Sequence, residues 1–469
     1  MTTLRNKKVA VLGLLDPGVA AIRLVSKEGG KIKAFGIATE KEIKRIQAEL
    51  KGISFEIETS EPPPDALLDF QQIILTPGGG RRYQKQIEAA KKKGIPVLTD
   101  LELALERYKS PVIAVTGTNG KSSVVDLIRQ AIEASGKKAL VAGGDYQDFC
   151  DSVLKTEKYD WVVLELNSSR LSRANTVKPH IAVLLNIYSG HSERHKNFSD
   201  YVDAKAKIFI HQTQDDFFVY QKTTGFIDKV IAQKGCQAQL VPFSFGLLEE
   251  GVFLRPDEKL IVARLKQKES RFSYLNFGLT GTHNVENAMA AVAVAKICGL
   301  SDPSIQQMLD SARPLPDRME LVQKIGGVSY FNDAKSVNSV ATASSLHCFE
   351  DKGVILIAGG TFSPHSKNRF LVEMFSKKVK CLILFGDQRR DFYKNWGDST
   401  ESYVVPELKD AVELAYQKAG KGDVVLFSPA ARPELHVHGS TQKRGAEFRR
   451  LVKELSEMEK AKQILTRRI

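Results

Sequence analysis

The sequence predicts an α/β protein of three domains built on parallel sheets. Its 469 residues correspond to three domains at about 150 residues each. Short apolar runs alternate with longer amphipathic stretches from end to end, which is typical of strands and helices in turn. Most of these runs end in Gly, Thr, Asn or Ser-Pro before a helical pattern follows. We therefore expect ligand-binding loops at the carboxyl ends of the strands.

The predicted strands are continuously apolar rather than alternating, as expected for strands that are covered on both faces of a parallel sheet. They are 9–12, 73–75, 112–115, 161–164, 181–185, 354–357 and 424–427. Two proline-containing segments, 106–111 and 311–316, indicate domain boundaries. A charged amphipathic helix is expected near the C-terminus, at 443–462. The predicted domains are 1–109, 110–313 and 314–469.

Composition excludes several classes of protein. Apolar residues make up 42% of the chain and charged residues 26%, as in ordinary globular proteins, which rules out a disordered tail, a collagen-like repeat and a disulfide miniprotein. Lys and Arg number 68 against 55 Asp and Glu, so the net charge is +13. That charge suits any polyanion but does not choose among them. No nucleic-acid-binding motif accompanies it, so we expect no nucleic acid partner.

The cysteines and the N-terminal sequence indicate in which cellular compartment the protein works. The cysteines form no Cys-x-x-Cys pair and no metal spacing, which indicates free thiols in a reducing environment. The first apolar run is short and is typical of a strand rather than a signal peptide. No apolar stretch approaches the ~20 residues that span a bilayer. We expect a soluble, cytoplasmic protein without a membrane span. The five cysteines are Cys150, Cys236, Cys298, Cys348 and Cys381.

The strongest chemical signal is the segment 115–123, which follows a predicted strand and precedes a helical run. Its glycines allow backbone N–H groups to close around phosphate oxygens, and the positive end of the helix dipole adds to the attraction. Lys121 can reach the terminal phosphates, and the Ser122 hydroxyl can bind Mg²⁺. The strict P-loop pattern has Gly where this chain has Val115, so this is a variant loop. Its predicted nucleotide-binding residues are Gly117, Thr118, Asn119, Gly120, Lys121, Ser122 and Ser123.

This loop, together with Glu165 at the end of the strand at 161–164, resembles that of the Mur ligase family. These ATP-dependent enzymes add amino acids to the UDP-muramoyl peptide of cell-wall precursors, and folylpolyglutamate synthases have a similar loop. The resemblance implies an N-terminal Rossmann-like UDP-binding domain, a central P-loop ATPase-type domain and a C-terminal Rossmann-like domain that binds the amino acid. It also implies ATP and Mg²⁺ as cofactors, and a UDP-linked muramoyl substrate and an amino acid as partners.

Three positions are similar to the family's metal site. Glu165 matches the glutamate that binds Mg²⁺, and His191 matches a second ligand, although the Asp that usually precedes it is Gly190. Lys205 matches a lysine that is carbamylated, which turns a cation into the kind of oxygen donor that Mg²⁺ prefers. The resemblance thus implies the metal ligands Ser122, Glu165, His191 and Lys205, and the catalytic residues Lys121, His191, Lys205 and Lys335.

The later motifs resemble the family in the same order. Asn284 and Asn287 correspond to asparagines that contact the adenine nucleotide. Arg318 corresponds to an arginine that steadies the nucleotide, with Asp317 where His is usual, and Asp333 to a ligand of the ribose. Lys335 would hold the carboxylate of the incoming amino acid. The substrate-binding residues that the resemblance implies are Gly13, Gly18, Pro77, Gly78, Asn167, Ser168, Lys335 and Ser428.

The members most similar in length and motif are the MurD-type ligases, which add D-glutamate to UDP-N-acetylmuramoyl-L-alanine. Two hydroxyls that these enzymes place on the glutamate side chain are replaced here by Val337 and Pro433, and a lysine after Gly360 is missing, with Lys367 as a stand-in. The first domain has no acid at the end of the strand 32–37. The sequence therefore leaves three alternatives open. They are the addition of L-glutamate or another amino acid, the use of another acceptor, and a non-catalytic paralogue that binds a nucleotide sugar. We expect a monomer whose domains close on their ligands.

Overall fold

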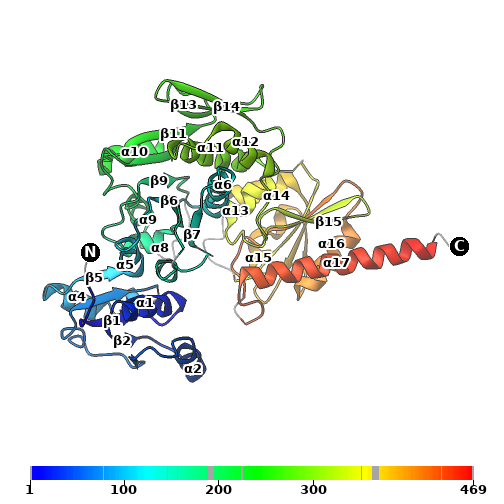
Figure 1. Cartoon of the computed structure of the whole chain (residues 1–469). Coiled ribbons are helices and arrows are strands. Elements are labelled where there is room, and N and C mark those ends of the chain that lie inside the picture. The colour runs from blue at the N-terminus through cyan, green and yellow to red at the C-terminus, as the bar shows by residue number, and fades with distance from the viewer. Residues whose placement is uncertain are drawn as a thin grey trace. The chain divides into compact units, whose positions relative to one another are not determined.

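The computed structural model describes residues 3–77, 79–144, 146–155, 157–188, 195–222, 225–349, 351–361, 369–434 and 436–466. Within them the chain forms three sheets with helices between the strands (Figure 1). This confirms the α/β class and its three sheet-forming regions. None of the described helices combines the length and apolar character needed to cross a bilayer. The described residues divide into two compact units, one within the ranges 1–187, 193–274 and 287–308, and the other within 188–192, 275–286 and 309–469.

The first sheet has five parallel strands in the order β3-β2-β1-β4-β5. The central strand β1 and its neighbour β4 confirm the strands predicted at 9–12 and 73–75. Both are buried almost throughout, as their continuous apolar sequences require. The elements are β1 (Lys8–Leu12), α1 (Asp16–Lys27), β2 (Lys31–Phe35), α2 (Glu40–Glu49), β3 (Phe55–Glu58), β4 (Gln72–Leu75), α3 (Gly79–Arg82), α4 (Gln84–Lys92), β5 (Val97–Thr99) and α5 (Asp100–Leu105).

The second sheet has nine strands in the order β14-β13-β12-β11-β10-β9-β6-β8-β7. Strands β6 to β12 are parallel to their neighbours, whereas β12, β13 and β14 pair antiparallel at one edge. The elements are β6 (Val112–Thr116), α6 (Lys121–Ala134), β7 (Ala139–Gly143), α7 (Phe149–Val153), β8 (Trp161–Glu165), α8 (Ser168–Arg173), β9 (Ile181–Leu184), α9 (Phe198–Ala206), β10 (Phe217–Gln221), α10 (Phe226–Lys234), β11 (Gln239–Ser244), β12 (Gly251–Arg255), β13 (Leu260–Leu265) and β14 (Lys268–Ser273), followed by α11 (Thr282–Ile297) and α12 (Asp302–Ser311).

The third sheet has six strands in the order β15-β16-β20-β17-β18-β19, and only the β15–β16 pair is antiparallel. The predicted C-terminal helix is α17, drawn in red in Figure 1, and its side chains Phe448 and Val452 belong to the same apolar core as Tyr330 and Val425 of the sheet. The elements are β15 (Glu320–Ile325), β16 (Val328–Asn332), α13 (Ser339–Leu346), β17 (Val354–Gly359), α14 (Arg369–Lys378), β18 (Val379–Phe385), α15 (Arg389–Trp396), β19 (Glu401–Val404), α16 (Leu408–Lys418), β20 (Val424–Phe427) and α17 (Thr441–Thr466).

The buried carboxylate of Glu102 links α5, the helix after the last strand of the first sheet, to the loop between α8 and β9. Glu102 of α5 accepts hydrogen bonds from the backbone N–H and hydroxyl of Thr99, at 2.9 and 2.8 Å. It also accepts from the N–H groups of Asn175 and Thr176, at 2.6 and 2.8 Å. Burial raises the pKa of Glu102, but these donors outweigh burial and lower the pKa below its ordinary value.

We predict that Glu102→Gln lowers the free energy of unfolding by about 2 kcal/mol at pH 7, because an amide cannot satisfy all these donors. The loss should shrink as pH falls below about 4, since a carboxylate with a lowered pKa stabilises the fold above its unfolded pKa and loses this effect as it is protonated. Urea unfolding from pH 3 to 7 measures both effects.

Glu42 provides the matched control. It caps α2 through Thr39 in the same way, but it is exposed and the described residues give it no donors from a distant segment. Glu42→Gln should have a smaller effect on unfolding, and equal losses for the two variants would contradict the role given to Glu102.

Candidate active site

The phosphate loop is fixed by contacts from two sides. It connects β6 to α6, and Gly120 at the helix start has φ 85°, where a Cβ would lie 2.3 Å from the side-chain oxygen of Asn287. Asn186, just after β9, accepts a hydrogen bond from the N–H of Asn119 at 2.9 Å and donates one to its carbonyl at 3.2 Å. The N–H of Thr118 donates to the Asn186 carbonyl at 3.0 Å. Only glycine fits at position 120, and the loop's shape depends on Asn186.

The loop also contains donors that suit phosphate. The side-chain nitrogen Nδ2 of Asn119 is buried and has no hydrogen-bond acceptor among the described residues. Lys121 Nζ donates to the carbonyls of Gly117 and Thr118, at 3.0 and 2.9 Å. A phosphate oxygen would supply the acceptor that Asn119 lacks and would compete with these carbonyls for Lys121. The loop therefore fits the phosphates of a nucleotide.

Oxygen donors of the predicted metal site meet beside the loop. Strand β8 pairs with β6, and this places Glu165 so that Ser122 Oγ donates to its Oε2 at 2.6 Å, with both residues buried. A hydroxyl and a carboxylate are the hard oxygen ligands that Mg²⁺ prefers, so this pair fits the ion. The described residues hold no group of three or more His, Cys, Asp and Glu that could bind a metal. His191, the further predicted ligand, lies outside the described residues.

Lys205 on α9 is only 1% exposed. Its Nζ donates to Thr116 Oγ1 at 3.4 Å and lies 4.8 Å from the centre of the Tyr201 ring. Burial lowers the pKa of Lys205 well below its ordinary value, and the positive charge of Lys121 lowers it further. The side chain is therefore driven toward its neutral amine form, which is the nucleophilic form of a lysine.

A cavity of about 840 Å³ lies between the loops of the first sheet and the α8 region. Pro77 and Asn167 line it, together with the cations Lys91, Arg170 and Arg173. The lining also contains the carboxylate of Glu88, and Arg170 is ion-paired with Asp100, but cations outnumber carboxylates in the lining, which suits an anionic ligand. The side chain of Asn167 also accepts from the N–H of Arg170 at 2.9 Å and so caps α8.

The remaining predicted substrate residues of this unit make contacts within the protein. Ser168 Oγ lies 2.9 Å from His195 Nε2, and Gly18 packs against the carbonyl of Gly13 at the end of β1. Neither glycine is among the described residues that line the cavity. Gly78 lies outside the described residues.

In the second unit, Asp333 follows β16 and its carboxylate is almost fully buried. Its Oδ2 accepts from the hydroxyls of Ser345 and Ser428, at 2.7 and 2.8 Å, and its Oδ1 from the N–H of Met319 at 3.3 Å. Burial raises the pKa of Asp333, and these donors offset part of that effect. Ser428 is itself fully buried and lies 2.9 Å from Thr342 Oγ1. In this arrangement the hydroxyl of Ser428 orients the carboxylate of Asp333.

Arg444 of α17 is fully buried beneath the loops of the third sheet. Its guanidinium donates to the carbonyls of Gly359, Ala334 and Ala431, at 3.3, 3.1 and 3.0 Å. These residues end or follow β17, β16 and β20, which are neighbours in the sheet. Burial lowers the pKa of Arg444 to about 9. One cation thus ties together the three loops that carry the predicted amino-acid site.

Comparison with known proteins gives two matching segments. Residues 115–295 match the Mur ligase middle domain, and residues 317–431 match the Mur ligase glutamate ligase domain. The chain is 32% identical over 433 residues to UDP-N-acetylmuramoylalanine–D-glutamate ligase of Geotalea daltonii, and the match covers 91% of this chain and 93% of that one. The chain belongs to the Mur ligase family. A ligase of the same name from Streptococcus agalactiae is 33% identical over 450 residues, 96% of this chain and 97% of its own.

Solved Mur ligases also share the fold. The structure of MurF ligase from Thermotoga maritima in complex with ADP superposes with a TM-score of 0.58 and 16% identity, and the match covers 96% of each chain. At that identity the likeness concerns the fold alone. It agrees with the three sheets seen here.

The structure brings one group of the predicted Mur ligase residues together. The loop 117–123, Glu165, Lys205 and Asn287 lie around the carboxyl ends of β6 and β8 in the first unit. The second unit holds another group of predicted residues. They lie directly after β16 and β20, just before β15, or at the start of α11. Its members are Asn284, Arg318, Asp333, Lys335 and Ser428. Their roles toward ligands stay predictions.

Sequence reasoning gave no role to two residues that shape these groups of Mur ligase residues, one in each unit. Asn186 holds the phosphate loop, and its position directly after a buried strand was a usable signal. Arg444 lies in the stretch 443–448, which resembles a Mur ligase motif, but the charged, amphipathic pattern of its helix does not indicate that its side chain is completely buried.

We predict that Asn186→Ala raises the Kd for ATP about tenfold, equivalent to ~1.4 kcal/mol, because the Asn119 backbone loses both hydrogen bonds that fix it. Isothermal titration with ATP measures the effect. Glu42→Gln, which is remote from the loop, serves as the control variant. Unchanged ATP affinity in folded Asn186→Ala would show that the loop keeps its shape without this side chain.

Proposed function

We propose that this protein is an ATP-dependent ligase of peptidoglycan precursor synthesis, which adds D-glutamate to UDP-N-acetylmuramoyl-L-alanine. The observation that supports this most is the whole-length similarity to ligases of that name. The phosphate loop with its buried donor on Asn119, and the Ser122–Glu165 pair beside it, are the parts that such a reaction needs. The protein would work as a cytoplasmic monomer and would need no nucleic acid partner.

The proposed reaction has two steps. A carboxylate oxygen of the muramoyl substrate attacks the γ-phosphorus of ATP, ADP leaves, and an acyl phosphate forms. The amino group of D-glutamate then attacks the acyl carbon, an amide bond forms, and phosphate leaves while the amine loses a proton. Lys121 would bind the transferred phosphoryl group and offset its charge. Asn284, Asn287, Arg318 and Asp333 would hold the nucleotide, and Lys335 the amino acid carboxylate.

Mg²⁺ would be held by Ser122, Glu165, His191 and carbamylated Lys205, and would offset the negative charge of the ATP phosphates. The buried pair of Ser122 and Glu165 supports this assignment. The muramoyl substrate would occupy the cavity lined by Pro77 and Asn167, where the cations match its diphosphate.

The proposed modification of Lys205 follows from its surroundings. A neutral amine attacks the carbon of CO₂, an N–C bond forms, one proton is released, and an anionic carbamate remains. Burial and Lys121 favour the neutral amine that this step requires. The product has oxygens in place of a cation, and it would sit beside Thr116 at the end of β6, next to the phosphate loop.

A different amino acid is the second candidate, and it rests on two positions. Val337 and Pro433 replace hydroxyls that would bind the glutamate side chain. A buried carboxylate without its donors costs about 1–3 kcal/mol for each missing hydrogen bond. L-glutamate or another amino acid would follow if this pocket has changed its specificity.

We predict phosphate release from ATP and Mg²⁺ with UDP-N-acetylmuramoyl-L-alanine only when D-glutamate is present, in a panel of D- and L-amino acids. Glu165→Gln should lower the rate on the order of 100-fold, because the pair with Ser122 loses its charge. Release with another amino acid alone would keep the ligase chemistry and replace the substrate. No release from protein that binds ATP would favour another acceptor or a nucleotide-sugar-binding protein.

We predict that buffer freed of CO₂ lowers the rate of phosphate release and that bicarbonate restores it. Lys205→Ala should be at least on the order of 100-fold slower and should not respond to bicarbonate. Lys207→Ala is the matched control, because this neighbouring lysine donates to the carbonyls of Ser172 and Ala174 instead. It should keep the bicarbonate response. A response of equal size in Lys205→Ala would rule out carbamylation there.

A further inference from the structure

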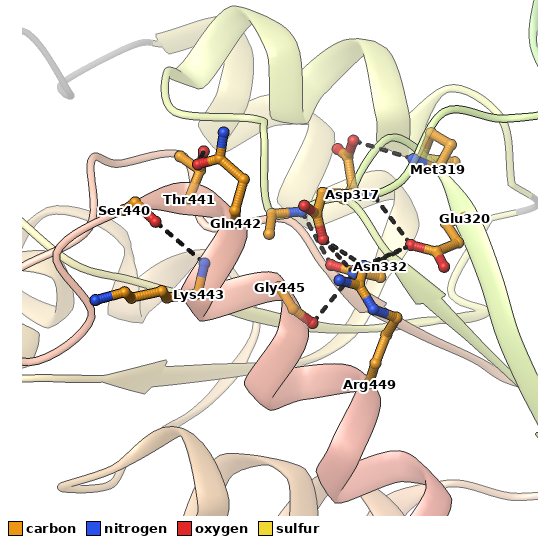
Figure 2. Close-up of polar contacts among 12 residues, drawn as sticks. Asp317, Met319, Glu320, Asn332, Ser440, Thr441, Gln442, Lys443, Gly445 and Arg449 are labelled. Carbon is orange, nitrogen blue, oxygen red and sulfur yellow. Dashed lines mark hydrogen bonds and ion pairs between the residues drawn. The ribbon is translucent and has the colours of Figure 1, made fainter. Parts of the chain in front are cut away.

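Asp317 occupies the position where the family resemblance leads us to expect histidine, and it makes an ion pair with the C-terminal helix. Its backbone has φ 63°, and its side chain is 3% exposed. Arg449 of α17 lies with its NH1 2.6 Å from Asp317 Oδ1 and 2.9 Å from Glu320 Oε2. Figure 2 shows Arg449 reaching from α17 between these two carboxylates.

The Asp317 carboxylate is enclosed on its other sides. Asn332, at the end of β16, donates its Nδ2 to Asp317 Oδ1 at 2.8 Å and to the carbonyl of Gly445 at 3.3 Å (Figure 2). A Cβ on Gly445 would lie 1.9 Å from Asp317 Oδ1, so only glycine allows α17 to come this close. A carboxylate buried in this way depends on its cation, because an unpaired buried charge is costly.

The backbone around Asp317 positions three residues of the proposed site. The carbonyl of Asp317 accepts the N–H of Lys335 at 3.1 Å. Arg318 is the next residue in the chain, and the N–H after it, from Met319, donates to Asp333 Oδ1. A shift of Asp317 would therefore move Arg318, Asp333 and Lys335 together.

We propose that Asp317 and Arg449 form a positioning pair, through which α17 holds the two segments that carry Arg318 and Lys335 in their ligand-binding geometry. Arg449 acts through Asp317 and contacts no ligand itself. The identity of the ligands rests on the proposed function, whereas the pair itself rests on the contacts within this unit.

The test compares Asp317→Asn, Arg449→Met and their double variant. Asparagine has nearly the shape of aspartate and tolerates positive φ, so Asp317→Asn removes the charge with little change in the backbone. Arg450→Met is the matched control, because Arg450 pairs with Glu454 at 2.6 Å on the same helix but both side chains are more than half exposed. Thermal unfolding confirms that each variant is folded at the assay temperature.

Two measurements that need no catalytic turnover test the positioning role of the Asp317–Arg449 pair. Titration with ADP and Mg²⁺ should show Kd raised about tenfold in each single variant. The double variant should bind no more weakly than Arg449→Met alone, because Arg449→Met already removes the ion pair with Asp317 together with that to Glu320. Hydrogen exchange should become faster at the amides of Met319 and Lys335 in these variants. Arg449→Lys, which keeps the charge, should recover most of the affinity and protection, and Arg450→Met should match the wild type.

Several results would overturn the proposal. They are multiplied losses in the double variant, unchanged exchange at Met319 and Lys335, or equal losses in Arg450→Met. The proposed function is judged separately by phosphate release from the wild type. A wild type that binds ADP without releasing phosphate would remove the assignment as a D-glutamate ligase acting on UDP-N-acetylmuramoyl-L-alanine and leave the positioning pair to be decided by binding and exchange.

Discussion

Side-by-side parallel strands are the constraint on which the nucleotide side of this protein depends. Strand β6 lies between β8 and β9, so the loops that leave their carboxyl ends must meet. This order places Glu165 against Ser122, and Asn186 against the backbone of Asn119. The third sheet repeats the principle, because β20 lies between β16 and β17 and Arg444 bonds to the segments at all three ends.

Three buried ionisable groups near the carboxyl ends of these strands solve the same electrostatic problem in different ways. Removing a charge from water is costly unless the protein replaces the lost solvation. Burial and the charge of Lys121 lower the pKa of Lys205, whereas Asp333 is compensated by hydroxyls and an amide, and Arg444 by carbonyl oxygens. Each solution also restricts where the group can move. A ligand that binds in either unit would therefore meet groups that are already oriented, which reduces the entropy lost on binding.

The sequence predicted the elements whose pattern is local. Continuous apolar runs identified the central strands, and the spacing of glycines, Lys121 and Ser122 identified the phosphate loop. The antiparallel strands β12–β14 at the edge of the second sheet were not predicted. A strand such as β14, with the sequence KESRFS, has no apolar run that would indicate it. Asp317 was recognisable as a departure from the family motif. Its partner Arg449 was not, since the two are 132 residues apart in the chain and only the fold brings them together.

The carboxylate of Glu102 has a consequence for how the chain folds during synthesis. Its donors Asn175 and Thr176 follow it by 73 and 74 residues. At a synthesis rate of about 5–20 residues per second, the ribosome needs roughly 4–15 s to deliver them after Glu102 itself. During this interval the side chain can bond only to Thr99. The nascent first domain is therefore incomplete until the second domain begins to emerge, and a pause between the two would prolong the time in which α5 is exposed to chaperones and proteases.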